Sequence, residues 1–156
     1  MVKNVIQSDD LHALRSFRHA SSALDSLYGQ FAKACGLSVN EYWSLVLIGE
    51  GICTQSEISR ELYLSRQTIN SAFKLLKKKQ LIVLIPDSRN LRIKHAELTE
   101  SGRQLYDAYI LKMRRLEEAA WINMDARDRS SLSELTWKLY HLIEELYHRS
   151  ENEKKI

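Results

Sequence analysis

Residues 54–81 contain the polar side chains whose types and spacing could do the most specific chemistry. On a helix that begins after Ser65, with about 100° between successive residues, Gln67 and Lys74 fall on one side. Glutamine and asparagine amides can pair with adenine edges, arginine with guanine edges, and lysine with phosphates. This face therefore has the chemistry needed to read a DNA major groove. The residues expected to contact DNA from this helix are Ser65, Arg66, Gln67, Thr68, Asn70, Ser71, Lys74 and Lys78.

Two short helices joined by a tight turn are predicted to hold this face outward. Thr54 is a suitable N-cap for the first helix, and Glu57 completes a capping box. Ser65 is a suitable N-cap for the second helix, whose other face is apolar and should be buried. The members of that apolar face are Ile69, Ala72, Phe73 and Leu76. An ordinary surface helix also has one polar and one apolar face, so this pattern alone leaves both interpretations open.

A β-hairpin is predicted directly after these two helices. Residues 81–85 are a β-branched apolar run, residues 86–90 are rich in turn formers, and residues 91–98 suit a returning strand. The tip of the hairpin carries Arg89, Asn90 and Arg92. Arginines at an exposed tip are suited to contacts with DNA phosphates or with a groove.

Long helices are predicted on both sides of this region. The first spans residues 9–36 and ends at Gly36, and a shorter helix follows from Ser38, with Glu41 in its capping box. A short strand is expected at residues 52–53. One continuous helix is predicted over residues 100–124, with Leu105 and Tyr109 on its apolar side, and a last helix over residues 125–149.

The first and last helices have apolar stripes that a single helix cannot bury. A second copy of the chain could cover these stripes, or the two helices could pack on each other within one chain, and the pattern leaves both arrangements open. The stripe residues are Leu11, Leu14, Phe17, Leu135, Leu139, Leu142 and Leu146.

Composition excludes several classes of protein. The chain has 156 residues, 44% hydrophobic and 28% charged, with a net charge of +3, which are ordinary values for a globular domain. No apolar run approaches the roughly 18 residues of a membrane span, and the first ten residues lack the apolar core of a signal peptide. Two cysteines are too few for a disulfide framework. A cytoplasmic protein with reduced thiols is therefore expected.

Other kinds of site were also considered. The histidines have no spacing to cysteines or carboxylates that is typical of a metal site, and no phosphate-binding loop or catalytic motif is present. We therefore predict no metal, no cofactor and no enzymatic activity. Cys35, near a helix end, is the candidate for a redox-sensing thiol, whereas Cys53 is expected to be a small buried hydrophobe. A helical interaction module that does not bind DNA is a further alternative, but it would have no use for Arg89 and Arg92 at a hairpin tip.

The order of these elements resembles the MarR family of bacterial transcription regulators, and the hairpin carries the most specific similarity. Members of that family commonly have Asp-x-Arg at the hairpin tip, then a strand, then Leu-Thr and a Gly that opens the next helix. The matching run here is Asn90-Leu91-Arg92, followed by Leu98-Thr99-Glu100-Ser101-Gly102. Asn90 stands where the family usually has Asp, so Asp87, or a hydrogen bond from Asn90 itself, is expected to replace the usual salt bridge. Tyr63 and Gln80 occupy positions that are often Gly, so strained backbone is expected at both.

The resemblance implies a mainly α-helical winged helix-turn-helix fold with a small β-hairpin and long N- and C-terminal dimerisation helices. Within a single MarR-like chain of residues 1–156, it implies a DNA-binding lobe at residues 38–98 and dimerisation regions at residues 9–36 and 100–149. The implied partners are a second copy of the chain and palindromic double-stranded DNA, with Arg92 and Arg89 at the minor groove.

The resemblance also implies an effector pocket between the dimer helices and the DNA-binding lobe. A small aromatic effector is the expected ligand, and Tyr42, Trp43 and Tyr109 are the candidate lining residues. Aromatic side chains at helical spacing also occur in ordinary cores, and that alternative stays open for each of the three.

Overall fold

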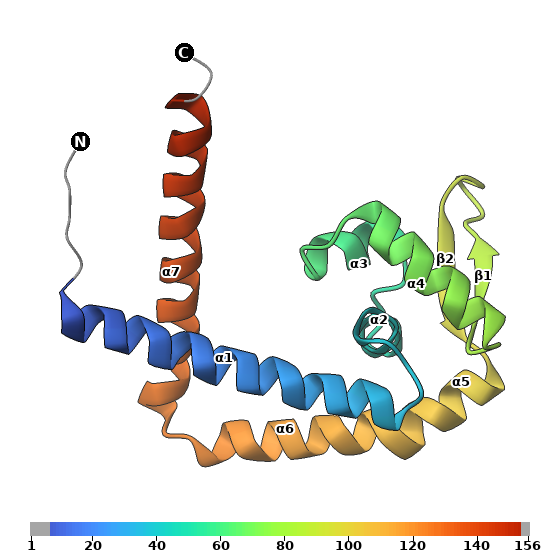
Figure 1. The fold of residues 1–156 in the computed structure, drawn as a ribbon. Helices are drawn as coiled ribbons and strands as arrows, with labels where there is room; N and C mark the ends of the chain where they lie inside the picture. Colours follow the sequence, from blue (N-terminus) through green and yellow to red (C-terminus); the bar gives the residue numbers. More distant parts are fainter. Residues whose placement is uncertain (1–6, 154–156) are drawn as a thin grey trace. The chain divides into compact units, whose positions relative to one another are not determined.

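The protein is mainly α-helical, with one two-stranded hairpin, as the computed structural model shows for residues 7–153 (Figure 1). In chain order the elements are α1 (Ser8–Ala34), α2 (Val39–Gly49), α3 (Gln55–Glu61), α4 (Arg66–Lys78), β1 (Ile82–Pro86), β2 (Lys94–Leu98), α5 (Glu100–Leu105), the π-helical turn η1 (Tyr106–Ile110), α6 (Leu111–Asn123) and α7 (Ala126–Glu153). The chain divides into two compact units, one ending at Met113 and the other beginning at Arg114. The predicted fold class is confirmed.

Side-chain caps begin the short helices of the first unit where the sequence predicts them. Ser38 with Glu41, and Thr54 with Glu57, form complete capping boxes at the starts of α2 and α3. At the start of α4, the Ser65 hydroxyl accepts the N–H of Thr68 at 3.1 Å. These bonds satisfy backbone donors that would otherwise have no partner in the first turn, so the predicted starts of the three helices are confirmed.

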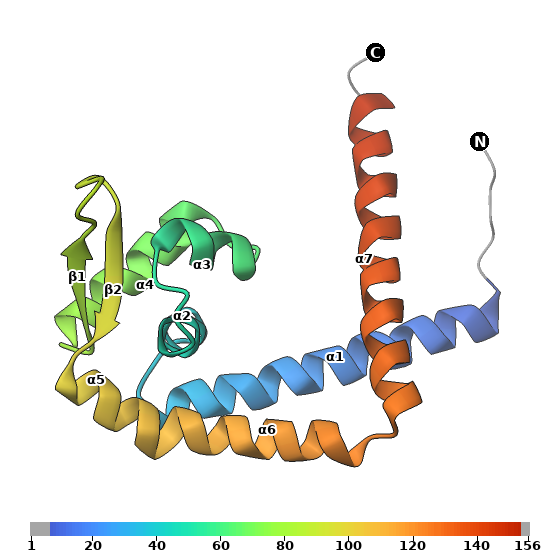
Figure 2. The same ribbon diagram turned by 180° about the vertical axis from the view of Figure 1, so that it is seen from behind.

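The core of the first unit lies around α2, which lies end-on between α1 and the α3–α4 pair in Figures 1 and 2. Leu45 of α2 and Ile58 of α3 are fully buried, and so is the predicted apolar face of α4. Fully burying a large apolar side chain stabilises a fold by about 1.5–3 kcal/mol. This burial fixes which face of α4 remains exposed. The most deeply buried large side chains are Phe73, Leu45, Ile58, Ile69, Leu76 and Ile110.

The hairpin is shorter than predicted. β1 and β2 pair antiparallel from Ile82 opposite Leu98 to Pro86 opposite Lys94, and Figure 2 shows them beside α4. The prediction that the returning strand begins at residue 91 is wrong. Residues 91–93 lie in the turn, where the Ile93 N–H donates to the Asn90 carbonyl at 2.8 Å. The strand expected at residues 52–53 reduces to one bridge between Thr54 and His95.

The continuous helix predicted over residues 100–124 is interrupted by η1. The extra residue of a π turn rotates the following helix relative to a continuous α-helix, so the predicted apolar side is only partly correct. Leu105 packs against the core as predicted, but Tyr109 does not. Tyr106 and Ile110 are buried, whereas Tyr109 is 47% exposed. A close approach accompanies this rotation. A Cβ at Gly49 would lie 2.1 Å from a ring carbon of Tyr106, so only glycine leaves room for that ring.

The second unit contains α7 and the part of α6 that begins at Arg114. The Arg129 guanidinium donates to the carbonyls of Trp121, Ile122 and Met124, which caps the end of α6. Much of the apolar surface of α7 is exposed, and Leu135 and Leu146 are 62% and 63% exposed. Within residues 7–153, no helix is both long enough and apolar enough to span a membrane.

An ion pair between a buried carboxylate and an exposed ammonium ties the end of α4 to the start of α2. Glu41 is 2% exposed, and its Oε1 lies 2.8 Å from Nζ of Lys79. The same ammonium donates to the Gly36 carbonyl at 2.9 Å. Burial alone would raise the pKa of Glu41, but Lys79 and the hydrogen bonds from Ser38 outweigh it and lower the pKa below its ordinary value. The ion pair thus holds the end of α4 against the turn that joins α1 to α2.

Gly102→Ala should destabilise the first unit. A Cβ at residue 102 would lie 1.9 Å from the Leu81 carbonyl oxygen, a backbone atom that also accepts the Thr99 N–H. Overpacking of this kind costs about 1–3 kcal/mol or more. Gly29→Ala is the matched control, since its Cβ meets nothing within 4 Å and should stabilise α1 by up to about 1 kcal/mol. Urea denaturation of both variants tests this, and equal stabilities would contradict the close contact.

Lys79→Met should lower the free energy of unfolding by about 1–3 kcal/mol at pH 7, because it leaves the Glu41 carboxylate buried without its cation. A carboxyl whose folded pKa is lowered adds stability above its ordinary pKa of 4.5, and that stability is lost as the pH falls through the folded pKa. Without Lys79 the pKa of Glu41 is lowered less, so acidification from about pH 6 to about pH 4 should destabilise the variant less than the wild type.

Urea denaturation at both pH values measures this difference. Lys78→Met removes a neighbouring exposed lysine and serves as the matched control. If both variants lost the same stability and kept the same pH dependence, the ion pair would have no role in holding α4.

Candidate nucleic-acid interface

The outward face of α4 is polar and basic along its whole length. Ser65, Arg66, Gln67, Ser71, Lys74 and Lys78 are exposed, and Thr68 and Asn70 are half-buried. The opposite face is buried against the core, with Ile69 and Leu76 both at 0% exposure. The predicted residues therefore lie together on the exposed side of one helix, whose orientation is fixed by its buried side.

Hydrogen bonds within α4 already use some of the donors and acceptors of these side chains, so the residues differ in what they can still offer to DNA. The Ser65 hydroxyl caps α4 and contacts the Thr68 hydroxyl at 2.8 Å. The Ser71 hydroxyl donates to the Gln67 carbonyl at 3.0 Å, so it retains only acceptor capacity. Arg66, Gln67 and Asn70 therefore have the side chains best suited to base edges, and they lie in the first half of the helix.

The turns before and after α4 each contain one residue whose backbone is in the left-handed region. Tyr63 has φ of 52° and Gln80 has φ of 58°, which confirms the strained backbone expected at both positions. The Ser59 hydroxyl donates to the Leu64 carbonyl at 2.6 Å, and the Thr99 hydroxyl donates to the Gln80 carbonyl at 2.6 Å. These side-chain bonds hold the turns before and after α4.

The hairpin tip, which we call the wing turn (residues 87–92), is organised by two short polar side chains. Oδ1 of Asp87 accepts the backbone N–H of Arg89 and of Asn90, each at 2.8 Å. Oδ1 of Asn90 accepts the N–H of Arg92 at 3.1 Å. The two backbone N–H groups, with a bond from His95, lower the pKa of Asp87. Arg89 and Arg92 are left exposed on a turn whose backbone is held from within.

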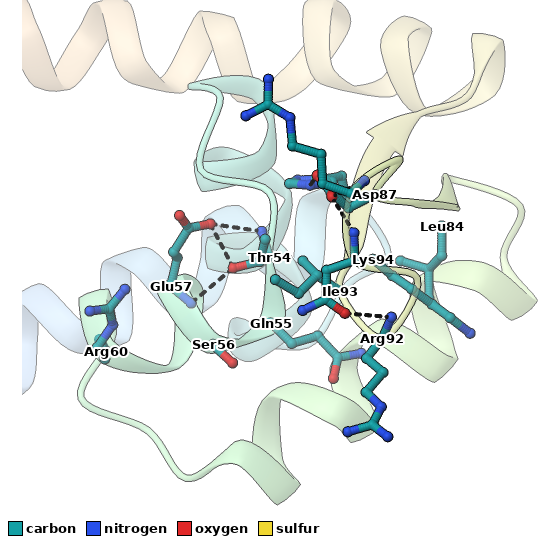
Figure 3. A pocket seen from close by; sticks show the side chains of 13 residues that line it. Thr54, Gln55, Ser56, Glu57, Arg60, Leu84, Asp87, Arg92, Ile93 and Lys94 are labelled. Atoms are coloured by element: carbon teal, nitrogen blue, oxygen red, sulfur yellow. Dashed lines mark hydrogen bonds and ion pairs between the residues drawn. The ribbon is translucent and has the colours of Figure 1, made fainter.

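A cleft of about 620 Å³ lies between the start of α3 and the hairpin. Figure 3 shows Thr54, Gln55 and Glu57 on one side of it, and Arg92, Ile93 and Lys94 on the other. Its charged lining residues are Glu57, Arg60, Asp87, Arg89, Arg92, Lys94 and His95. Sequence reasoning missed Gln55, Arg60 and Lys94 as neighbours of the wing turn, because no local spacing indicates which helix the hairpin packs beside.

The candidate effector residues differ in exposure. Tyr42 is 3% exposed and packs in the core, which favours its structural interpretation. Trp43 is half-buried, with its ring 5.0 Å from that of Tyr28. Tyr109 is 47% exposed on η1. The three residues are therefore not equivalent candidates for lining a pocket.

The two thiols are both half-buried. Burial raises the pKa of Cys35, and burial together with Glu57 and Glu97 raises the pKa of Cys53. A raised pKa keeps a thiol protonated and less reactive at neutral pH. In the part of the chain that the structure describes, no three histidine, cysteine or acidic side chains are grouped so as to hold a metal ion.

The winged region is similar to known sequences. Residues 36–93 match the profile of the MarR family. Over 89 residues the chain is 32% identical to the HTH-type transcriptional repressor NicR of Pseudomonas putida. That match covers 57% of this chain and 56% of the repressor, so it spans little more than half of the relative's length.

Solved structures share the fold over most of the chain. A MarR family regulator from Neisseria meningitidis is similar with a TM-score of 0.73 at 18% identity, over 88% of this chain and 98% of that one. Streptococcus pneumoniae FabT, solved in complex with DNA, is similar with a TM-score of 0.64 at 19% identity, over 86% of this chain and 99% of that one. The winged region is thus similar in sequence to the MarR family, and the chain shares the fold of solved MarR family regulators.

Proposed function

We propose that this protein is a transcription regulator that binds specific double-stranded DNA as a homodimer and acts in the cytoplasm, without enzymatic activity. The observation that carries the proposal is the outward face of α4, where Arg66, Gln67 and Asn70 precede Lys74 and Lys78 on one exposed side. The relatives support it, because NicR is named a transcriptional repressor and FabT was solved with DNA.

In the proposed complex α4 lies in the major groove. Its first half, with Arg66, Gln67 and Asn70, meets base edges, since amide and guanidinium groups can pair with them in two places at once. Lys74 and Lys78, one and two turns further along, meet phosphates or the groove walls. Lys79, which also lies near the end of α4, is held by Glu41 and is not part of this set.

The wing turn is proposed to contact the neighbouring minor groove. Arg92 enters the groove and Arg89 meets mainly phosphate, with Asn90 supporting the turn between them. A narrow A·T-rich minor groove has a stronger negative potential, which favours an inserted arginine. The interaction-module alternative is weaker here, because it gives no role to two exposed arginines on a turn held by Asp87.

A homodimer is proposed because the apolar stripes of the terminal helices are not fully covered within one chain. Leu11 and Phe17 of α1 are 44% and 42% exposed, and Leu142 of α7 is 48% exposed. Leu14 and Leu139 are half-buried. A second copy would bury these side chains and place two α4 helices about one DNA turn apart, which fits a palindromic site.

Release of DNA by a small aromatic effector is a further part of the proposal, and it comes from the family resemblance. Such a ligand would act by binding more tightly to a dimer in which the two α4 helices do not match the spacing of the half-sites. A redox-sensing role for Cys35 is less well supported, because burial raises the pKa of that thiol.

Selection of binding sites from a random duplex library by the purified protein tests DNA recognition. We expect a palindromic consensus with half-sites about 10 bp apart. Gln67→Ala should then weaken binding to the consensus by about 1–3 kcal/mol and relax preference at one base position. Gln104→Ala, the same change on exposed α5, is the control. Equal losses on consensus and random DNA would show that Gln67 does not read bases.

Replacing Leu139 and Leu142 together with Lys should dissociate the dimer, because two charges would enter the apolar stripe of α7. Ser133→Lys places a charge on the opposite side of the same helix and should leave the dimer intact. Sedimentation equilibrium measures the assembly, and circular dichroism shows whether the helices persist. A stable dimer of the double variant would place the interface elsewhere.

A further inference from the structure

A line of three side chains joins the wing turn to the start of the helix-turn-helix. The Sγ of Cys53, just before α3, lies 3.2 Å from Nδ1 of His95 on β2. Nε2 of the same imidazole lies 3.2 Å from Oδ2 of Asp87. The other Asp87 oxygen accepts the N–H groups of Arg89 and Asn90. Each member contacts the next through a different atom, so the line is continuous from Cys53 to the backbone of the wing turn.

The direction of each hydrogen bond follows from the chemistry of the groups. An ionised carboxylate only accepts, so Nε2 of His95 must carry a proton toward Asp87. In the neutral imidazole Nδ1 is then an acceptor, and the Cys53 thiol is the donor. The Cys53 thiol therefore donates to His95, and His95 donates to Asp87. The backbone N–H groups of Arg89 and Asn90 donate to Asp87 from the wing turn. The thiol selects the tautomer of His95 that supports Asp87.

The backbone fixes the positions of the first two members. The Ala96 N–H donates to the Cys53 carbonyl at 2.8 Å, and Thr54 forms a bridge with His95. His95 itself pairs with Ile85 across the hairpin. The backbone that carries the imidazole is thus fixed to β1 and to the segment before α3. The wing turn beyond it is held through side chains.

We propose that His95, set between Cys53 and Asp87, is a positioning residue that holds the wing turn in the orientation from which Arg89 and Arg92 reach DNA. The part of this inference that concerns DNA affinity rests on the proposed function, whereas the part that concerns the order of the wing turn does not. It gives a role to Asp87, which provides the wing carboxylate that Asn90 cannot supply. It also gives a role to Cys53 as a hydrogen-bond donor.

Groups of both signs surround His95. Cys53 and Glu57 face it from the α3 side and Asp87 from the wing turn, while Arg60, Arg89, Arg92 and Lys94 line the same cleft. Glu97, two residues further along β2, acts on Cys53.

Four variants separate the contributions of the line. His95→Leu removes both contacts, whereas His95→Gln can keep a donor near the position of Nε2. Cys53→Ser keeps a donor toward Nδ1, and Cys53→Ala removes it. His148→Gln, on exposed α7, is the control for a histidine change outside the wing. Thermal denaturation of each variant identifies those that fold.

The first readout is the order of the wing turn in the free protein. In the wild type the amide order parameters of Arg89 and Asn90 should be near about 0.85, and in His95→Leu they should fall below about 0.6. Cys53→Ala should show a smaller fall that Cys53→Ser reverses. Unchanged order parameters in folded His95→Leu would overturn the inference, whether or not the protein binds DNA. If His95→Leu does not fold, the comparison of Cys53→Ala with Cys53→Ser decides in the same way.

The second readout is affinity for the selected duplex. His95→Leu should bind about tenfold more weakly, as expected for the loss of one charge-assisted hydrogen bond. His148→Gln should bind as tightly as the wild type, and His95→Gln should bind more tightly than His95→Leu. Equal losses in His95→Leu and His148→Gln would overturn the role of His95. A disordered wing turn with unchanged affinity would contradict the proposed wing contact with DNA.

Discussion

Burial of one side of α4 is the constraint on which the rest of the winged region depends. Ile69, Phe73 and Leu76 are at most 1% exposed against α2 and α3, and removing any one of them would leave a cavity that costs about 2–5 kcal/mol. A helix that buries one face so completely cannot rotate. The polar face is therefore presented as a fixed surface, which is what base recognition needs, because paired hydrogen bonds tolerate little rotation.

Close backbone contacts carry this fixed orientation to the hairpin. The Leu81 carbonyl accepts the Thr99 N–H, and Gly102 approaches the same carbonyl without a side chain. In the middle of β2, the Ala96 N–H donates to the Cys53 carbonyl. The base of the hairpin is thus tied both to α5 and to the segment before α3. The wing turn can be placed relative to α4 only because both ends of its base are held.

The second unit has a different balance of forces. Its helices bury little apolar surface by themselves, and Leu135, Ile143, Leu146 and Tyr147 are all more than half exposed. Apolar patches of this kind on a monomer indicate an interaction surface. A regulator built in this way would divide two tasks between its parts: a packed core that presents the reading helix, and amphipathic helices that are completed by association.

The sequence by itself determined the short helices α2, α3 and α4, their caps and the polar outward face of α4. Capping boxes at Ser38 and Thr54 and the apolar spacing of α4 depend on neighbours within one turn of helix, so local pattern was sufficient. The unusual residues at Tyr63 and Gln80 were also identified from sequence, through the family pattern. The group that replaces the usual salt bridge of the wing was narrowed to Asp87 or a hydrogen bond from Asn90 in the same way.

Only the tertiary structure decided which distant residues support that face. The π turn at Tyr106 accompanies the close packing of its ring on Gly49, and no local signal distinguishes it from a continuous helix. The contact of Cys53 with His95 joins residues that local periodicity cannot relate, and it forms because β2 bridges to Thr54. Contacts of this kind depend on how elements pack, which side-chain periodicity does not encode.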